Sequence, residues 1–424
     1  MIFHKLKAGS LQFAILISAI IAVLLSIFVM LVHSHTLFAK KSDLLIEMIQ
    51  QSENTILFGL QDFSVATDTT FIAIDETKNM TASLHRSYWG MFGKIHAETQ
   101  AKFKTFEKIA LVSGWLDAKD RTALYLKETN RPLIIVGNTK IQGKTYLPKQ
   151  GVRAGNISGN SYYGNQLIYG NILKSKEELP KLPEKLTKQL AFLQKMPLPT
   201  NDDNYIDAQP NKTYTNSFTK PTKTIFSNNE LDLFGMKLTG NIIIRSNTKI
   251  KVAASTMLKD VILIAPEIEI EANTKGVFQA IASENVSIGK NCELKYPSSL
   301  VILAEDALEN DSPKNIKQHI FIDENTSVKG IMCYFQDKTN NRFEPQIILA
   351  KNTTIEGFVY CEQQLELLGS IHGSLYTSGF ITKQFSSVYQ NHIYNGTISN
   401  TELLNEYVGF PIENLDYKVA KWLY

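Results

Sequence analysis

The longest predominantly hydrophobic run lies close to the N-terminus and covers Leu11–Val32, with Gln12, Ser18 and Ser26 as its polar members. It contains no charged residue and no proline. At about 1.5 Å per residue such a helix is about 33 Å long, enough to cross a hydrocarbon core of about 30 Å. A secretory signal peptide would have a shorter apolar core and a small-x-small cleavage site, and the following His33–Thr36 lacks that pattern. We therefore predict a retained transmembrane helix over residues 11–33.

The helical period continues beyond the hydrophobic run, over residues 34–66. Leucine, isoleucine and methionine recur there at steps of mostly three and four residues, with lysines and glutamates elsewhere around the helix. No glycine or proline separates this amphipathic pattern from the hydrophobic run, so we predict one rod that leaves the bilayer. Two roles stay open: a plain juxtamembrane stalk, or a helix that packs against sister helices.

Residues 67–195 are predicted to form a mixed, β-rich domain with one short helix. β-branched and aromatic runs such as Tyr88–Phe92 and Leu133–Val136 indicate strands, and glycines separate the later ones. Leucines at helical spacing between Glu177 and Lys195 indicate the short helix. Residues 196–235 are polar and contain four prolines, which favours a linker or a long surface excursion.

A short pattern, Asn-Thr-x-Ile or Asn-Thr-x-Val with one looser copy, recurs along the chain and marks candidate corners. Asparagine tolerates the left-handed backbone conformation that a sharp corner needs. The following aliphatic residue then points back into the core. Short strands that meet at such corners are typical of a β-solenoid. The candidate corner residues are Asn138, Asn247, Asn285, Asn325 and Asn352.

Because the corner pattern itself recurs, we predict a β-solenoid domain over residues 236–400, in preference to a β-sandwich with strands at similar spacing. Residues 401–424 are rich in aromatic side chains, and we predict that they cap the last rung of the solenoid. A docking tail is the alternative. The fold class is therefore mainly β: an N-terminal transmembrane helix that continues into a stalk helix, a mixed β-rich domain, then a β-solenoid.

Charge and cysteine content exclude two classes of protein. The 424 residues contain 44 Lys and Arg against 41 Asp and Glu, a formal net charge of +3, so we predict no nucleic-acid partner. Three cysteines without CxxC spacing exclude a disulfide-dense scaffold. Buried free thiols and a single disulfide both stay open for Cys292, Cys333 and Cys361.

No catalytic, cofactor or metal signature stands out, so we predict a non-catalytic protein without a cofactor or a metal site. A polysaccharide hydrolase would need paired carboxylates that converge on a groove. The acidic residues available in the predicted solenoid are Glu305, Asp306, Asp323, Glu324, Glu356 and Glu366. No spacing among them selects a pair, and an envelope-tethered carbohydrate-binding or carbohydrate-cleaving β-helix stays the alternative to a structural protein.

Residues 1–60 resemble minor pilins and pseudopilins. A short arm with Lys5 and Lys7 and a small-residue Ala-Gly-Ser sequence precedes a long apolar helix that continues into an amphipathic one. The resemblance implies that a pilin-type peptidase cuts between Gly9 and Ser10. It then puts Ala14 at the fifth mature position, where major pilins carry glutamate and tip-type minor pilins can lack it. The implied role is a structural subunit at the tip of a type IV-pilus-like filament or a secretion pseudopilus.

A second resemblance lies near the C-terminus. Gly357–Phe380 is similar to bactofilins, which are polymer-forming β-solenoids with short, glycine-cornered rungs. The similarity lies in the style of the rungs, and it implies a solenoid in this part of the chain.

The charges that flank the hydrophobic run bear on its orientation. Lys5 and Lys7 lie closer to it than Lys40 and Lys41, and a short arm is the easier end to leave inside. We therefore expect residues 1–10 in the cytoplasm of a bacterium, one span of the inner membrane, and the remainder in the periplasm or on a filament. Expected partners are the membrane and either other envelope or filament proteins or further copies bound through the N-terminal helix; a glycan stays open. The predicted function is a structural subunit or scaffold of a cell-envelope assembly.

Overall fold

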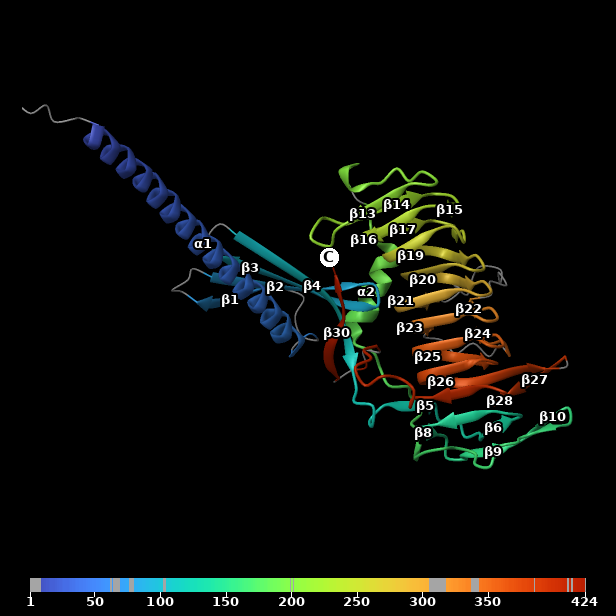
Figure 1. Ribbon diagram of the computed structural model, residues 1–424. Coiled ribbons are helices and arrows are strands. Elements are labelled where there is room, and N and C mark those ends of the chain that lie inside the picture. The colour runs from blue at the N-terminus through green and yellow to red at the C-terminus, as the bar shows by residue number, and fades with distance from the viewer. Residues whose placement is uncertain are drawn as a thin grey trace, which may run out of the picture.

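The computed structural model places a long helix, an antiparallel sheet and a β-solenoid one after another across the molecule (Figure 1). Most of the predicted cytoplasmic arm, including Lys5 and Lys7, lies outside the described residues. The structure describes the 424-residue chain apart from residues 1–8, 62, 64–68, 76–79, 102–103, 199, 201, 305–317, 337–342, 385, 410–411, 413–414 and 424.

Helix α1 covers Gly9–Gln61 and joins the predicted transmembrane and stalk segments in one element. Its first part is apolar around the whole circumference, so nothing in the sequence restricts burial to one side. Its second part is amphipathic and buries Met48, Thr55 and Ile56. The helix therefore changes along its length from a free rod to a docked one.

The docked part of α1 covers one face of a five-stranded antiparallel sheet of order β1-β2-β3-β4-β30. The predicted strand Tyr88–Phe92 is instead the β2–β3 hairpin, where Gly90 has a φ of 60°. The strands are β1 (Thr69–Asp75), β2 (Met80–Trp89), β3 (Phe92–Ala101), β4 (Lys104–Trp115) and β30 (Asp416–Leu423).

The C-terminal segment differs from its prediction as a solenoid cap over residues 401–424. Its strand β30 pairs antiparallel with β4, so that Val419 lies opposite Val112. The aromatic rings of β30 contact the helix-and-sheet unit: the Tyr417 ring lies 5.0 Å from that of Phe63, and the Lys108 ammonium lies 4.2 Å from the centre of the Trp422 ring. Tyr407, which precedes β30, packs on the solenoid instead, with its ring 4.7 Å from that of Tyr296. The two ends of the described chain therefore meet in one small helix-and-sheet unit.

The solenoid fills the chain between β4 and β30. Its strands run parallel to their neighbours in successive rungs, which places like side chains in columns. One column, Ile250, Ile268, Val286, Ile320 and Ile347, is entirely buried in the solenoid core. Such columns explain why one inward aliphatic residue per short strand suffices to build the core.

The strands of the solenoid are short at its two ends and longer in its middle. Two small antiparallel additions are the β10–β11 hairpin (Asn156–Ile157 and Asn160–Ser161) and β27 (Ser387–Gln390), which pairs with β26. The remaining strands are β5 (Thr122–Leu126), β6 (Leu133–Val136), β7 (Lys140–Gln142), β8 (Lys144–Leu147), β9 (Val152–Ala154), β12 (Ile172–Lys174), β13 (Thr213–Asn216), β14 (Lys223–Ser227), β15 (Leu231–Leu233), β16 (Lys237–Gly240), β17 (Ile242–Ser246), β18 (Lys249–Val252), β19 (Met257–Ile270), β20 (Lys275–Ile288), β21 (Glu293–Leu303), β22 (His319–Ile322), β23 (Ser327–Phe335), β24 (Ile347–Leu349), β25 (Thr354–Leu367), β26 (Ser370–Gln384), β28 (His392–Tyr394) and β29 (Thr397–Ser399).

The solenoid is larger than the predicted range of residues 236–400. Strands β13, β14 and β15 lie within the predicted linker 196–235 and pair with β16, β17 and β18. Their inward residues Ile225 and Leu233 are buried among the polar ones. Strands β5 to β12 lie within the predicted mixed domain 67–195, yet β5 pairs with β26 and β7 with β29. Rungs formed by residues before α2 therefore stack against rungs formed by residues near the end of the solenoid.

Helix α2 (Glu184–Lys195) connects these two sets of rungs. It lies along the outer face of the solenoid, between the early rungs at one end and β13 at the other (Figure 1). Leu186, Leu190 and Leu193 are buried against that face. The helix begins after Pro183, so the predicted helix over Glu177–Lys195 is shorter than expected; a single 3-10 turn, Asp202–Asn204, follows it.

Candidate functional site: the projecting part of α1 and the attachment of the solenoid

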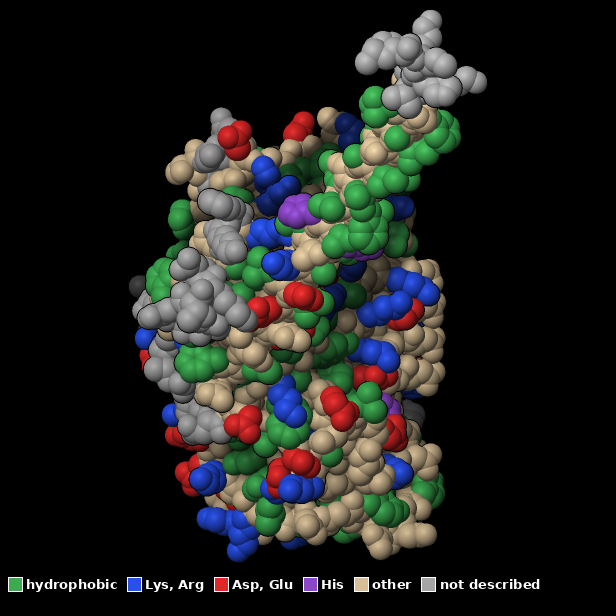
Figure 2. Space-filling model, turned by 60° about the vertical axis from the view of Figure 1, so that its left-hand side comes forward, with side chains coloured by type: hydrophobic (Ala, Val, Ile, Leu, Met, Phe, Trp, Pro, Cys, Tyr) green, Lys and Arg blue, Asp and Glu red, His purple; other side chains and the backbone are tan. Residues whose placement is uncertain are grey.

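We call residues 9–41 of α1, all of which are exposed, the projecting part. It is the largest exposed apolar surface in the described chain. An 18-residue window of the helix has a mean hydropathy of 3.2 and is 0% buried, and the helix is long and apolar enough to cross a membrane. Met30 is 75% exposed and Phe38 72% exposed. Hydrophobic side chains cover this part in Figure 2, whereas charged groups are scattered over the body of the molecule. Gly9 and Ser10, the candidate cleavage residues, form its first turn.

The docked part of α1 is fixed to the sheet by packing and by buried polar contacts. Ile56 packs with Leu84 and Ile95 in one hydrophobic cluster. The Ser52 hydroxyl lies 2.8 Å from the Thr99 hydroxyl. Together with an ion pair between Lys108 and Glu53, these contacts set the angle at which the projecting part leaves the sheet.

The opposite face of the sheet carries the solenoid. Met91 and Phe92, at the tip of the β2–β3 hairpin, share a buried cluster with Ile262 and Ile281 of the solenoid. Burial of such large side chains stabilises the contact by about 1.5–3 kcal/mol each. Because α1 and the solenoid occupy opposite faces of the sheet, the solenoid leaves the projecting part of α1 uncovered.

A buried glutamine fixes the hairpin to the solenoid. The Met91 backbone N–H donates to Gln279 Oε1 at 2.8 Å, and Gln279 Nε2 donates to the Trp89 carbonyl at 2.8 Å. The Ser299 hydroxyl holds the same Gln279 oxygen at 2.9 Å. A side chain added at Gly90 would overlap the amide of Gln279. The glutamine therefore fits this hairpin only because glycine occupies the turn.

An ion pair and a turn add to the same junction. Lys421 Nζ of β30 lies 2.5 Å from Asp260 Oδ1 of β19, and that aspartate side chain is 1% exposed. The Phe218 ring contacts the Trp89 ring edge-on at 5.2 Å between centroids.

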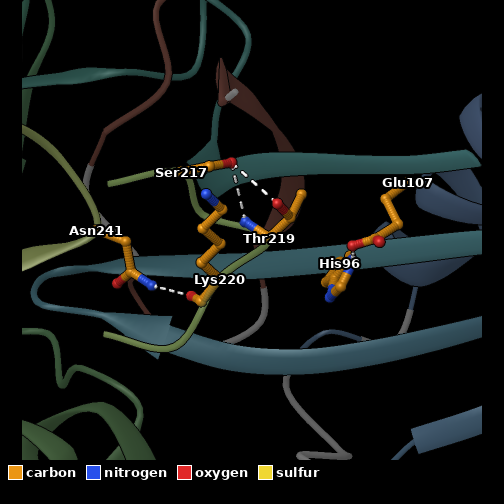
Figure 3. Close-up of polar contacts among 6 residues, drawn as sticks. All are labelled: His96, Glu107, Ser217, Thr219, Lys220 and Asn241. Atoms are coloured by element: carbon orange, nitrogen blue, oxygen red, sulfur yellow. Dashed lines mark hydrogen bonds and ion pairs between the residues drawn. The ribbon is translucent and has the colours of Figure 1, made fainter. Parts of the chain in front are cut away.

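Figure 3 shows the turn that carries Ser217, Thr219 and Lys220, near the strands that carry His96 and Glu107. The turn is held by its own hydrogen bonds, from the Thr219 N–H to Ser217 Oγ at 3.3 Å and from Asn241 Nδ2 to the Lys220 carbonyl at 2.7 Å. On the strands, His96 Nε2 lies 2.9 Å from Glu107 Oε2. The Phe218 turn belongs to the solenoid, between β13 and β14. It contacts the sheet through Trp89, and together with the hairpin and β30 it holds the solenoid at a fixed orientation.

The chain segment after β4 and the segment before β30 connect the sheet to the solenoid. Arg121, which is 1% exposed, ties these two segments together. Its guanidinium donates to the carbonyls of Leu404 at 2.7 Å and Asn405 at 2.6 Å, and at 3.2 Å to those of Leu403 and Tyr407. Burial lowers the pKa of this guanidinium from its ordinary value. We call Arg121 and the carbonyls that it binds the neck.

The five candidate corner asparagines differ in backbone conformation. Asn325 and Asn352 have φ values of 58° and 59°, the left-handed conformation that a corner needs. Asn138, Asn247 and Asn285 are not among the described residues with positive φ; Asn285 lies within β20, and Gly137 precedes Asn138 with a φ of 65°.

The left-handed asparagines that the sequence pattern does not identify include Asn273 and Asn291. Asn291 Nδ2 reaches Asn273 Oδ1 at 3.4 Å, and Asn352 Nδ2 reaches Asn325 Oδ1 at 3.2 Å. The residue after each corner is buried and bonds a carbonyl: the Thr326 hydroxyl donates to Gly289 O at 2.8 Å. Threonine follows three of these four corner asparagines, and Cys292 follows Asn291.

The three cysteines are buried free thiols, which decides between the two alternatives left by the sequence. Cys292 takes the place of the corner threonine, and its Sγ lies 3.1 Å from the Glu271 carbonyl. Burial raises the pKa of Cys333 well above its ordinary value and that of Cys361 to about 12. Thiolates at these positions are disfavoured at neutral pH.

The acidic residues considered for hydrolysis do not converge on a pair within the described chain. Glu324 binds Lys290 at 2.9 Å, and Glu356 binds Lys329 at 2.8 Å. Glu366 is buried and accepts the Lys383 backbone N–H. Glu305 and Asp306 lie outside the described residues, and among those described no group of three or more His, Cys, Asp or Glu residues could hold a metal ion.

Comparison with known proteins gives a distant structural likeness. The competence-associated pilin ComZ from Thermus thermophilus is similar at 10% sequence identity and a TM-score of 0.17; the match covers 84% of this chain and 87% of that one. No protein-family model matches the chain, and no curated protein matches it.

Proposed function

We propose that this chain is a structural subunit of a pilin-like assembly in the bacterial cell envelope and that it displays a β-solenoid. The observation that carries the proposal is the division of α1. One part is apolar and exposed all round, and the other is docked on an antiparallel sheet. An apolar helix that projects from a small helix-and-sheet unit can lie in a lipid bilayer. The same helix can later move into a bundle of identical helices.

The exposed part of α1 needs a cover other than water. Apolar surface in water costs about 25 cal/mol per Å², and this part exposes long side chains along more than 20 residues. A bilayer supplies one cover, since the run contains no charged group. Neighbouring helices in a filament supply another. The proposal uses both, one before assembly and one after it.

The position of the solenoid supports display. It is attached to the sheet face opposite α1, by the hairpin, the Phe218 turn, β30 and the neck. Helices can therefore pack around α1 without meeting the solenoid attachment. In this proposal the N-terminus lies in the cytoplasm before assembly, and the solenoid lies in the periplasm or on the filament surface.

The first test is the intact mass of the N-terminal peptide from protein in its native membrane. We expect a chain that begins at Ser10, after removal of Met1–Gly9. A Gly9→Leu variant is the control and should retain the leader. A wild-type chain that begins at Met1 contradicts the pilin-like part of the proposal and leaves a permanently tethered scaffold.

The second test asks whether α1 contacts other helices. The native thiols are buried, so a single introduced cysteine reports on its own position. We expect Ile21→Cys, at a residue 50% exposed on α1, to form cross-linked species in the native envelope. Val388→Cys, at a residue 47% exposed on the solenoid, is the matched control. Absence of cross-links from Ile21 and its neighbours on all sides of the helix contradicts assembly through α1.

A further inference from the structure

A polar cavity lies beside the segment that leads into α2. Its volume is about 380 Å³. One wall is formed by Glu178, Leu179 and Lys181. The other is formed by the residues directly after strands β5 and β23 and by residues within strands β25 and β26. We call it the α2-entry pocket. It is separate from α1 and from the neck, so the function proposed above does not account for it.

The charges that line the α2-entry pocket balance. Two ammonium groups, on Lys127 and Lys181, oppose two carboxylates, on Glu178 and Glu362. A phosphate or another strong anion would meet both carboxylates, and a polyamine would meet both ammonium groups. A neutral ligand that both donates and accepts hydrogen bonds suits all four side chains. Hydroxyl groups have this property.

The solenoid wall of the pocket is held in position before any ligand binds. The Gln336 N–H donates to Glu362 Oε2 at 2.7 Å, and the Ser378 hydroxyl donates to the Glu362 carbonyl at 2.7 Å. Gln363 Nε2 contacts the Gln336 carbonyl at 3.4 Å, and both glutamines are buried. Because successive rungs fix these groups, little ordering entropy is lost when a ligand binds.

The pocket wall formed by the segment before α2 is more exposed than the solenoid wall. The Lys181–Glu178 ion pair spans 3.5 Å, and its side chains are 71% and 76% exposed. Exposed pairs of this kind contribute little to stability, so they can exchange partners with a ligand. Leu179 and Tyr360 add apolar surface to the same cavity. A sugar ring matches this combination, since it carries hydroxyl groups around its edge and C–H groups on its faces.

We infer that the α2-entry pocket binds a neutral saccharide of one or two rings. The volume lies at the lower end of the range of about 300–1,000 Å³ found for small-molecule sites, which fits that size. Glu178, Lys181 and Glu362 hydrogen-bond the hydroxyl groups, and Gln336 and Gln363 keep Glu362 in place. This inference is independent of the proposed assembly, so either can fail while the other holds.

The test uses full-length protein in a zwitterionic detergent whose head group is not a sugar. The probes are N-acetylglucosamine and its β-1,4-linked dimer, measured by saturation-transfer NMR and calorimetry. We expect a dissociation constant on the order of 1 mM. Glu362→Gln and the double variant Glu178→Ala with Lys181→Ala should each weaken binding at least tenfold. Glu177→Ala, at an exposed neighbour outside the pocket, should bind like the wild type.

Three outcomes would overturn the inference. The first is no binding of either probe at 50 mM. The second is equal binding by the wild type and by the double variant, whose two exposed positions do not threaten folding. The third is tighter binding of glucuronate or glucosamine than of the neutral probes, which would identify a site for a charged ligand. If Glu362→Gln lowers the melting temperature, the double variant alone decides.

Discussion

At the scale of single residues, the corner asparagines differ in what they stabilise. Asn352 and Asn247 each donate a side-chain amide hydrogen bond to an asparagine one rung away, at 3.2 Å and 2.9 Å. Both residues are exposed. Only Asn352 of the two has a left-handed backbone, with a φ of 59°. The pair therefore separates the contribution of backbone conformation from that of the amide bond.

We predict that Asn352→Ala destabilises the solenoid by about 1–2 kcal/mol more than Asn247→Ala, because alanine pays the left-handed penalty at the first position alone. Asn352→Gly should recover most of the difference, since glycine adopts this conformation readily. Urea unfolding of the purified protein measures all three. Equal losses for the two alanine variants would show that the amide bond, and not the backbone, explains the choice of asparagine.

The residues that join the solenoid to the sheet could not be predicted from the sequence. Gln279 lies in an ordinary strand, and its partners Trp89 and Met91 are far away in the chain. Arg121 binds carbonyls near residue 405, and carbonyls carry no sequence signal. The repeat did lead to Asn325 and Asn352, because a local conformational need selects asparagine there. Local demands are visible in a sequence, whereas long-range partners are not.

At the scale of elements, α1 could be predicted because an apolar run and then an amphipathic period follow each other without glycine or proline between them. Strands β13 to β15 could not, because their short apolar runs lie among prolines and polar residues that are typical of a linker. The pairing of β30 with β4 was missed for another reason. Its aromatic side chains suit a cap and a sheet equally well, and only the partner strand decides.

The docking of α1 on the sheet makes a prediction about neighbouring side chains. Ile56 is fully buried, and Leu57 is 56% exposed. We expect Ile56→Ala to destabilise the helix–sheet unit by about 2–5 kcal/mol, because it removes buried methyl groups and leaves a cavity. Leu57→Ala should change stability by less than about 0.5 kcal/mol. Hydrogen exchange of β2 and β3 is the measurement, and similar effects of the two variants would contradict the docked arrangement.

The neck makes a separate prediction. We expect Arg121→Lys to raise hydrogen exchange across residues 403–409 at least tenfold, since an ammonium group cannot bind the whole fan of carbonyls that the planar guanidinium holds. Arg131→Lys is the control, because Arg131 makes a single exposed contact with Gln390 Oε1 at 2.7 Å. Unchanged exchange in the Arg121 variant would mean that packing alone holds the two connections together.

At the scale of the whole molecule, ion pairs between rungs couple the solenoid to pH. The pKa of Glu324 is lowered by a hydrogen bond from Lys290, and that of Glu293 by one from Lys275. Burial raises the pKa of Glu366, which acts in the opposite direction. Where the folded pKa is lowered, the unfolded chain binds protons first, so the stability present above the ordinary value of 4.5 is lost as the pH falls.

We therefore predict that the urea midpoint of the solenoid falls between pH 6 and pH 3, and that 1 M NaCl reduces the fall by screening these exposed pairs. Glu324→Gln should make the pH dependence shallower. Glu177→Gln, at an exposed residue outside the pairs, should leave it unchanged. A midpoint that rises on acidification would mean that the buried Glu366 dominates.

The stacking of early rungs on late ones determines when the protein can finish folding. Strand β5 can pair with β8 soon after both are made, because Leu124 lies opposite Thr145. Its other edge pairs with β26, where Leu124 lies opposite Leu375, so that edge stays open until about 250 further residues have been synthesised, which takes tens of seconds at 5–20 residues per second. During that delay the early strands present hydrophobic side chains and open edges to any neighbouring chain. In the assembly proposed above, which places the solenoid beyond the membrane, we expect this open edge to need a holding chaperone there, and the yield to depend on the speed of translocation.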